Sequence, residues 1–282
     1  MDELTMYAME TSVALSIRDL SHDFIAPDGR RRPVLDGLML QIATGEIVSI
    51  VGRSGAGKTT LFNLVSGLLS PSAGRIEIGN QRGGAAGFVA YMLQKDLLLP
   101  WRTVLQNSLL GLELRGTVTA PHRANAAAML ERYGLGAHLD AYPAALSGGQ
   151  RQRVALTRTL LTEPSILLLD EPFSALDYET RLMLEDDVMA LRSDRGISVI
   201  LVTHDIEEAI AMGDRVVVLG GRPGRIVEDI PVRLTTHGRR DAANAREAPE
   251  FRAYHRRLWA ALKGTAEAPE TANARETAAP EI

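Results

Sequence analysis

Short and almost uninterrupted runs of apolar residues recur along the chain. Four of them, at residues 47–51, 166–169, 197–202 and 215–219, consist mainly of Val, Ile and Leu. A strand with one solvated face alternates apolar and polar residues, whereas a continuous apolar run suits a strand that is covered on both faces. The four runs therefore predict fully buried strands of an α/β sheet.

A second group of strands is predicted near the N-terminus. Residues 13–19 and 34–42 are rich in apolar residues, and Pro27-Asp28-Gly29 between them is a turn signal. Two early strands joined by a turn indicate an antiparallel sheet. Further strands are predicted at 75–78, 88–93 and 226–232, the last as a short edge strand.

The pattern becomes helical between residues 96 and 161. This segment is rich in Ala and Leu, and Gly or Pro interrupts it at Pro100, Gly111, Gly116, Gly134, Gly136 and Pro143. Gly and Pro are the residues that most often end helices. We therefore expect several short helices that form a helical insertion within the α/β domain.

The C-terminal region departs from the strand pattern. Phe251, Tyr254, Leu258 and Leu262 form an apolar stripe at helical spacing among Arg and His. Such a helix could lie on a membrane surface, but docking on the protein core is the favoured interpretation. We assign 238–264 to an extension that contains this helix. Residues 265–282 have too little apolar surface to fold, and we expect them to be disordered.

Composition narrows the class of protein. The 282 residues are 45% hydrophobic and 23% charged, which is typical of a soluble globular chain, and the net charge of -4 argues against nucleic-acid binding through bulk charge. Cys is absent, which excludes disulfides and fits a reducing compartment. We find neither a signal peptide nor an apolar run of the roughly 18 residues that span a bilayer. We therefore expect a cytoplasmic protein that reaches a membrane only through a partner.

A phosphate-binding motif follows the first of the buried strands. Gly52-Arg-Ser-Gly-Ala-Gly-Lys-Thr59 matches G-x-x-x-x-G-K-[ST], and a predicted helix at 60–69 follows it. Lys58 would bridge the β- and γ-phosphates, and the Thr59 hydroxyl would coordinate Mg²⁺. A chance glycine-rich turn is the alternative, which the flanking strand and helix make improbable. The residues predicted to bind a nucleoside triphosphate are Gly52, Arg53, Ser54, Gly55, Ala56, Gly57, Lys58, Thr59 and Thr60.

Two later strands end on polar side chains. Asp170 and Glu171 follow the run 166–169, at the strand edge where α/β sheets bind ligands. Asp170 would hold Mg²⁺, and Glu171 would polarise an attacking water. Asp-Glu-Pro is also a good helix start, but the phosphate motif favours the catalytic interpretation. His204 follows the run 197–202 at the same expected edge, so we favour a functional role over a structural one.

A second phosphate-seeking feature lies at residues 146–153, Leu-Ser-Gly-Gly-Gln-Arg-Gln-Arg. Ser147 could cap the helix that follows, and Gly148 and Gly149 would expose N–H groups at its positive end. Such an end attracts phosphate. A small chain with one phosphate loop has no evident need for this second site.

The order of these motifs resembles that of the ATP-binding cassette (ABC) ATPases, over about residues 13–232. The resemblance implies a RecA-like P-loop NTPase core with an N-terminal antiparallel β-subdomain and an inserted α-helical subdomain, together spanning 13–237. In that family two cassettes dimerise head to tail, and the signature of one closes on the nucleotide of the other. The residues that would act in trans are Ser147, Gly148, Gly149, Gln150 and Asp177.

The resemblance also suggests individual roles. Phe24 looks like the aromatic residue that stacks on adenine, although an ordinary core residue is the alternative. Gln94 looks like the loop glutamine that approaches Mg²⁺ and the attacking water, and it would sense the membrane partner. Asp177 looks like the residue that communicates across the dimer, and His204 like the histidine that contacts the γ-phosphate and orders Glu171. Leu93 departs from the family, which often has Phe there.

Loop sequences point to a branch of the family. Leu98–Val104 and Asp214–Val227 look like the importers of nitrate, aliphatic sulfonates and taurine, with thiamine precursors as the alternative cargo. This branch implies an ATPase subunit, peripheral on the cytoplasmic face of the inner membrane, that binds ATP and Mg²⁺. Its partners would be a second copy, an integral-membrane permease and, indirectly, a solute-binding protein, with no nucleic acid.

Rival functions remain open at this point. A soluble ABC ATPase of DNA repair or translation would usually carry coiled coils, zinc modules or a second cassette, and the sequence contains one cassette and no Cys. A P-loop kinase would share only the phosphate loop and gives no reason for residues 146–150. Within transport, export is also possible, and the sequence does not name the solute.

Overall fold

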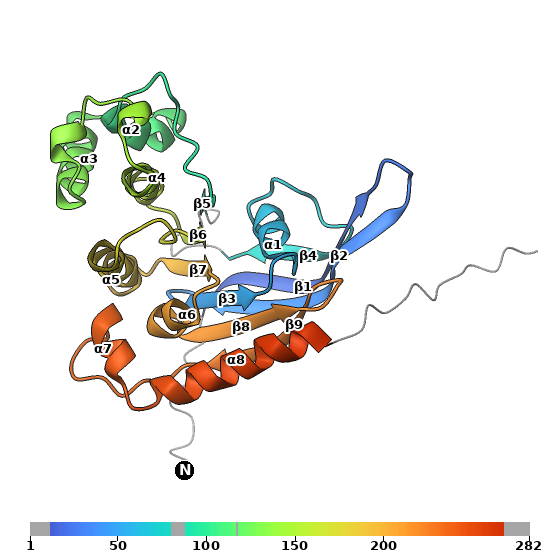
Figure 1. Cartoon of the computed structure of the whole chain (residues 1–282). Helices are drawn as coiled ribbons and strands as arrows, with labels where there is room; N and C mark the ends of the chain where they lie inside the picture. The colour runs from blue at the N-terminus through green and yellow to red at the C-terminus, as the bar shows by residue number, and fades with distance from the viewer. Residues whose placement is uncertain (1–11, 80–87, 117, 268–282) are drawn as a thin grey trace, which may run out of the picture.

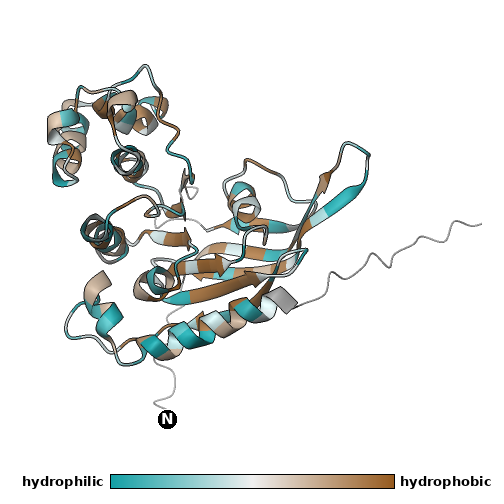
Figure 2. Ribbon diagram, viewed as in Figure 1, coloured by the Kyte–Doolittle hydropathy of each residue, from teal (hydrophilic) through white to brown (hydrophobic). Residues whose placement is uncertain are grey.

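The centre of the molecule is a six-stranded sheet in the order β5-β6-β7-β3-β8-β9, parallel except for the antiparallel edge strand β9. We describe it from a computed structural model of residues 12–79, 88–116 and 118–267. Every residue of β3, β6 and β7 is buried, as the continuous apolar runs predict. Figure 2 shows the central strands as mainly hydrophobic. The strands are β3 (Ile47–Gly52), β5 (Val89–Met92), β6 (Ile166–Asp170), β7 (Ser198–Val202), β8 (Arg215–Gly220) and β9 (Arg225–Pro231).

A three-stranded antiparallel sheet with the order β2-β1-β4 lies beside the central sheet (Figure 1). Its strands are β1 (Val13–Ile25), β2 (Arg31–Ala43) and β4 (Ala73–Ile78). Ile17 pairs with Leu40 on one side and with Ile76 on the other. Helix α1 (Lys58–Val65) packs its fully buried Phe62 into the core shared with these strands. The predicted antiparallel pair is thus present, but β1 continues to Ile25.

The helical insertion lies at the β5 side of the central sheet (Figure 1), and its helix α4 (Gly148–Leu160) shares a hydrophobic core with β6 and β7. It also contains α2 (Val104–Leu114) and α3 (Ala120–Arg132), with 3₁₀ turns at η1 (Gly136–His138) and η2 (Pro143–Ala145). Thr103, Thr119 and Ser147 each begin a helix with a reciprocal capping box. These caps satisfy N–H groups that a helix start leaves without partners. Helices and two sheets together form the expected mixed α/β fold (Figure 1).

The remaining helices are α5 (Tyr178–Arg195), α6 (Ile206–Met212), α7 (Ala242–Glu247) and α8 (Phe251–Glu267). Helix α8 lies along β8 and β9 (Figure 1), where Phe251 and Leu258 are buried, and Tyr254 and Leu262 pack against the same core. It continues beyond Gly264 to Glu267, so residues 265–267, expected to be disordered, are helical. The rest of that expected tail, 268–282, lies outside the described residues.

No helix within residues 12–79, 88–116 and 118–267 is both long and apolar enough to cross a bilayer.

Candidate active site

The phosphate loop leaves the buried strand β3 and enters helix α1. Gly57 has φ 92°, a left-handed conformation that glycine adopts without strain. A side chain at Gly52 would place its Cβ 2.4 Å from the carbonyl oxygen of Leu219, so only glycine fits there. The Lys58 ammonium folds back over the loop and donates to the carbonyl oxygens of Gly52 (2.7 Å) and Arg53 (3.2 Å). The loop therefore presents a lysine and backbone N–H groups together, which suits a phosphate group.

Asp170 ends strand β6 next to the phosphate loop. Its carboxylate accepts hydrogen bonds from the Thr59 hydroxyl and from the Tyr91 hydroxyl, both at 3.3 Å. Asp170 is only 3% exposed, and this burial raises the pKa of its carboxyl, with the neighbouring charge of Glu171 acting in the same direction. Burial therefore disfavours the charged form of this carboxyl group, and a cation bound beside it would offset that cost.

Glu171 is held in an unusual backbone conformation. Its φ of 49° lies in the left-handed region, which non-glycine residues seldom occupy and which recurs at functional sites. Its amide donates to the carbonyl of Val202 on strand β7 (2.8 Å), and its own carbonyl accepts from Gln152 of α4 (3.0 Å). Both neighbouring elements therefore fix the backbone from which the Glu171 carboxylate projects.

Two predicted residues meet at the Glu171 carboxylate. Gln94 donates to Glu171 Oε2 through its side-chain amide at 3.0 Å, and His204 Nδ1 lies 3.4 Å from the same oxygen. Gln94 follows β5 and His204 follows β7, the two strands that flank β6. The His204 side chain is 67% exposed, so it remains accessible to a ligand. The three groups could hold a water molecule and remove its proton.

One cavity of about 1370 Å³ joins part of the phosphate loop to the three predicted catalytic residues. Those on its wall are Gly52, Arg53, Ser54, Ala56, Lys58, Gln94, Glu171 and His204. Thr59 contacts Asp170 beside it, and Thr60 follows in the first turn of α1. Gly55, Gly57, Thr59, Thr60 and Asp170 are absent from the wall, although they belong to the phosphate loop or its immediate surroundings. Also absent are Phe24, Ser147, Gly148, Gly149, Gln150 and Asp177.

Phe24 lies on β1, with its ring in an edge-to-face contact with the ring of His22 at 4.8 Å between centroids. It is 42% exposed, so it is not an ordinary core residue. Its predicted contact with adenine remains a prediction.

The two predicted trans-acting elements are exposed helix starts. Ser147 caps α4, accepting from the Gln150 amide at 3.2 Å while its own amide donates to the Gln150 side chain at 2.8 Å. Asp177 caps α5 and accepts from the Thr180 amide at 2.9 Å, a bond that lowers the pKa of Asp177. Neither cap contributes to the cavity of its own chain. Both are consequently available to a ligand or partner outside it.

Several residues of the site were not predicted. Tyr91 approaches Asp170 because β5 runs parallel to β6, with Tyr91 opposite Leu168. Burial, then the charge of Asp170, raises the pKa of the Tyr91 hydroxyl, which keeps it a donor. The turn after β8 packs closely against the phosphate loop, because a Cβ on Gly224 would lie 2.2 Å from the Ala56 carbonyl oxygen. Helix α8 also lines the cavity through Trp259, Leu262, Lys263, Gly264 and Thr265.

The side-chain oxygen atoms beside the phosphate loop are suited to Mg²⁺. Thr59 and Asp170 offer two oxygen atoms 3.3 Å apart, and Mg²⁺ prefers oxygen ligands. Among the described residues there is no group of three or more His, Cys, Asp and Glu side chains that could hold a metal ion. A site with one hydroxyl and one carboxylate fits an ion whose other ligands are phosphate oxygens and water.

Comparisons with known proteins agree on one protein family. The sequence model described as ABC transporter matches residues 35–174. The chain is 48% identical over 202 residues to the aliphatic sulfonates import ATP-binding protein SsuB 2 of Agrobacterium fabrum, covering 71% of this chain and 75% of the relative. It is 39% identical to the uncharacterized ABC transporter ATP-binding protein YtlC of Bacillus subtilis, covering 88% of this chain and 95% of the relative.

Solved structures agree with this result. The dimeric ATP-binding cassette MJ0796, in a post-hydrolysis state bound to ADP and Pi, superposes with a TM-score of 0.70 at 29% identity, covering 78% of this chain and 99% of that chain. These matches confirm the predicted P-loop NTPase fold and the similarity to the sulfonate branch. The chain therefore belongs to the ABC transporter family, as an ATP-binding subunit that hydrolyses ATP.

Proposed function

We propose that the chain is the ATPase subunit of an importer that works as a head-to-tail dimer. It would lie on the cytoplasmic face of the inner membrane and drive a separate permease. The observation that carries this proposal is the exposed start of α4 at Ser147, which lies off the cavity that contains Lys58. A phosphate-seeking helix start that its own chain does not use suits a nucleotide held by a second chain.

The roles of individual residues follow from the geometry. Lys58 would release its bonds to Gly52 and Arg53 and bind the β- and γ-phosphates. Thr59 and Asp170 would hold Mg²⁺, directly or through water, and the bound ion would neutralise charge that develops on the phosphate oxygens. Such an ion would also offset the unfavourable burial of the Asp170 carboxylate.

Glu171 is the proposed general base. A water placed between its carboxylate and the γ-phosphorus would donate a proton to Glu171 as its oxygen attacks, and the bond to the ADP oxygen would break. Gln94 and His204 both meet Glu171 Oε2, so they would orient that carboxylate and the water. The Ser147 and Gly149 backbones of a second chain would then complete the site around the γ-phosphate.

Aliphatic sulfonates are the cargo we propose. Relatives named as aliphatic sulfonate import ATP-binding proteins in Agrobacterium fabrum, Burkholderia lata and Pseudomonas syringae are 44–48% identical to this chain. A permease and a solute-binding protein would recognise the sulfonate itself. In proteoliposomes with both partners, a sulfonate-loaded binding protein should stimulate ATP hydrolysis; stimulation by thiamine precursors instead would move the chain to another branch.

Glu171→Gln tests the dimeric mechanism. Because the amide cannot accept the proton, ATP hydrolysis should fall at least about a hundredfold, while ATP still binds. With ATP, this variant should elute as a dimer in size-exclusion chromatography. Glu131→Gln, which changes an exposed residue of α3, is the control and should hydrolyse ATP as the unmodified chain does. Undiminished hydrolysis by Glu171→Gln would refute the role of Glu171, and a monomer at saturating ATP would refute the proposed dimer.

A further inference from the structure

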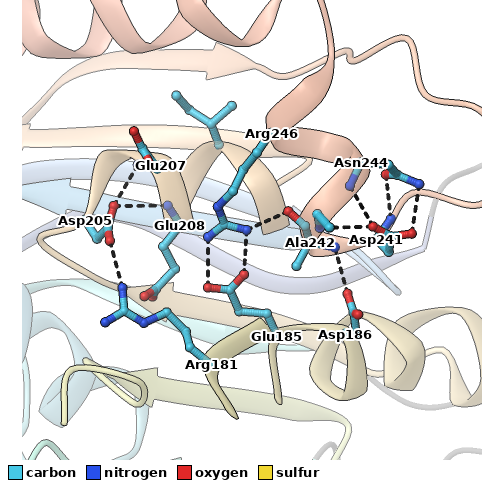
Figure 3. Close-up of polar contacts among 12 residues, drawn as sticks. Arg181, Glu185, Asp186, Asp205, Glu207, Glu208, Asp241, Ala242, Asn244 and Arg246 are labelled. Atoms are coloured by element: carbon cyan, nitrogen blue, oxygen red, sulfur yellow. Dashed lines mark hydrogen bonds and ion pairs between the residues drawn. The ribbon is translucent and has the colours of Figure 1, made fainter. Parts of the chain in front are cut away.

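A cluster of charged residues, partly buried, surrounds Asp205, the residue that follows His204 (Figure 3). It joins helices α5, α6 and α7 through Arg181, Glu185, Asp205, Glu208 and Arg246. Glu185 is fully buried and Glu208 is 4% exposed. None of the five lines the nucleotide cavity. Buried charges of this kind destabilise a fold unless they are paired, so their arrangement needs a reason.

An ion pair and a backbone-amide hydrogen bond hold helix α7 against α5. The Arg246 guanidinium donates two hydrogen bonds to the two oxygens of Glu185, at 2.8 and 3.0 Å. The Ala242 amide, at the start of α7, donates to the Asp186 carboxylate at 2.7 Å. A guanidinium and a carboxylate that meet through two parallel bonds fix orientation as well as distance. Figure 3 shows both contacts on the same side of α5.

The same helix α5 also holds the His204 loop. Arg181 lies one helical turn before Glu185, and its guanidinium donates to the Asp205 carboxylate at 3.3 Å. Asp205 follows His204 and caps α6, accepting from the amides of Glu207 (2.9 Å) and Glu208 (3.3 Å). Its own amide donates to the Thr203 hydroxyl at 3.0 Å. Asp205 therefore links the residue after His204 to α5.

The cluster contains two arginines and three carboxyl groups. Arg181 and Arg246 can compensate two carboxylates, and Glu185 and Asp205 already use them. Glu208 is the third carboxyl group: burial, then the charges of Glu185 and Asp205, raises its pKa to about 8. Its Oε1 has no hydrogen-bond partner among the described residues. Loss of Arg246 would leave the fully buried Glu185 carboxylate without its partner, and loss of Arg181 would leave the partly exposed Asp205 without its ion pair.

We propose that Arg246 of helix α7 is a positioning residue for ATP hydrolysis, which acts on His204 through Glu185, Arg181 and Asp205. The C-terminal extension would then set the position of His204 against Glu171. The inference rests on the proposed role of His204. A purely structural α7 is the competing explanation, and it predicts loss of stability without a selective loss of the chemical step.

The test compares ATP binding and turnover in the full-length chain. Arg246→Ala should lower kcat about tenfold or more, as small displacements of catalytic groups do, with the Kd for ATP unchanged within about twofold. Arg246→Lys, which keeps one charged bond, should fall between this variant and the unmodified chain. Arg257→Ala removes an exposed ion pair from α8 of the same extension and should leave kcat unchanged.

A second variant guards against a folding failure. Arg181→Met removes the ion pair from α5 to Asp205, and because the two side chains are 26% and 33% exposed, the change should cost the fold less than Arg246→Ala does. It should reproduce the low kcat with normal ATP binding. If both residues act in one chain of contacts, the two losses should not add in the double variant. Additive losses, or ATP binding that weakens in parallel with kcat, would overturn the proposal.

His204→Ala separates the two levels of inference. If it retains full activity, the proposed role of His204 fails and the positioning role fails with it. If it is impaired while Arg246→Ala and Arg181→Met keep the kcat of the unmodified chain, only the positioning role is refuted.

Discussion

Two groups of charged residues meet at the loop that contains His204, and they are built differently. In the nucleotide cavity, Glu171 receives one contact each from Gln94 and His204, at 3.0 and 3.4 Å, and His204 remains largely exposed. Behind the loop, Glu185 is fully buried and receives two bonds from Arg246. The first group is open to a ligand, whereas the Glu185–Arg246 pair of the second is completed within the chain.

This difference predicts which residues contribute mainly to ATP hydrolysis and which contribute mainly to the stability of the fold. Groups on the wall of the cavity are left with incomplete partners within the chain, so their removal should impair chemistry more than folding. Groups that complete one another inside the protein should do the reverse when one partner is lost. The comparison can be tested by measuring stability and activity on both sides of the His204 loop.

The largest effect on stability is expected for Arg246→Ala. It leaves the buried Glu185 carboxylate without its partner, which should cost about 3–5 kcal/mol in the free energy of unfolding. Replacing both residues by Met removes the two charges together and should restore most of this loss. Urea unfolding of the three proteins measures it. A single variant as stable as the unmodified chain would show that the pair is not needed for the fold.

Lys58→Ala should show the opposite balance. The Kd for ATP should rise at least about a hundredfold, because the charged partner of the phosphates is lost. Burial lowers the pKa of Lys58, so its charge is unfavourable in the folded chain and its removal should leave the melting temperature almost unchanged. Calorimetry with ATP and thermal unfolding measure the two quantities. Normal ATP affinity would contradict the assignment of the phosphate loop; Arg30→Ala, on the exposed turn after β1, is the control.

Burial of Glu208 should make the free energy of unfolding depend on pH. Its pKa is about 8 in the folded chain against an ordinary value of 4.5, so between these values the folded state binds the additional proton. The free energy of unfolding should therefore fall as pH rises, by up to about 1.4 kcal/mol per pH unit. Glu208→Gln lacks this proton and should gain stability relative to the unmodified chain from pH 6 to pH 8. A constant difference in urea unfolding would refute it; the exposed Glu247→Gln is the control.

The smallest effect is expected at the surface. Arg257 of α8 and Glu228 of β9 form an ion pair at 3.1 Å, with side chains 58% and 33% exposed. Arg257→Ala should cost less than about 1 kcal/mol, and added salt should reduce this further. Chemical unfolding at low and high salt measures it. A loss as large as that of Arg246→Ala would mean that burial does not distinguish the two pairs.

Most of the central sheet could be predicted from sequence, because a continuous apolar run has few stable environments other than a covered strand. The runs at 47–51 and 166–169 became β3 and β6 in this way. Helix α7 could not be predicted, since its six residues carry no apolar periodicity. Its docking depends on the bond from Arg246 to Glu185, two residues separated by 61 positions. Contacts at such a distance leave no local pattern.

The site was predictable to a similar degree. Residues that end neighbouring parallel strands must meet at one sheet edge, which is why Asp170, Glu171 and His204 could be grouped from sequence. Tyr91 and Gln152 reach the same edge through hydrogen bonds whose geometry no motif encodes.

In the proposed dimer, each nucleotide site is shared by two chains. Lys58→Ala disables the phosphate loop, and Ser147→Arg blocks the exposed helix start. Alone, each variant should be almost inactive. In an equimolar mixture, random pairing makes half of the dimers mixed with one intact site each, so ATP hydrolysis should recover to about a quarter of the level of the unmodified chain. A mixture no more active than the separate variants, or full activity of Ser147→Arg alone, would contradict a site built from two chains.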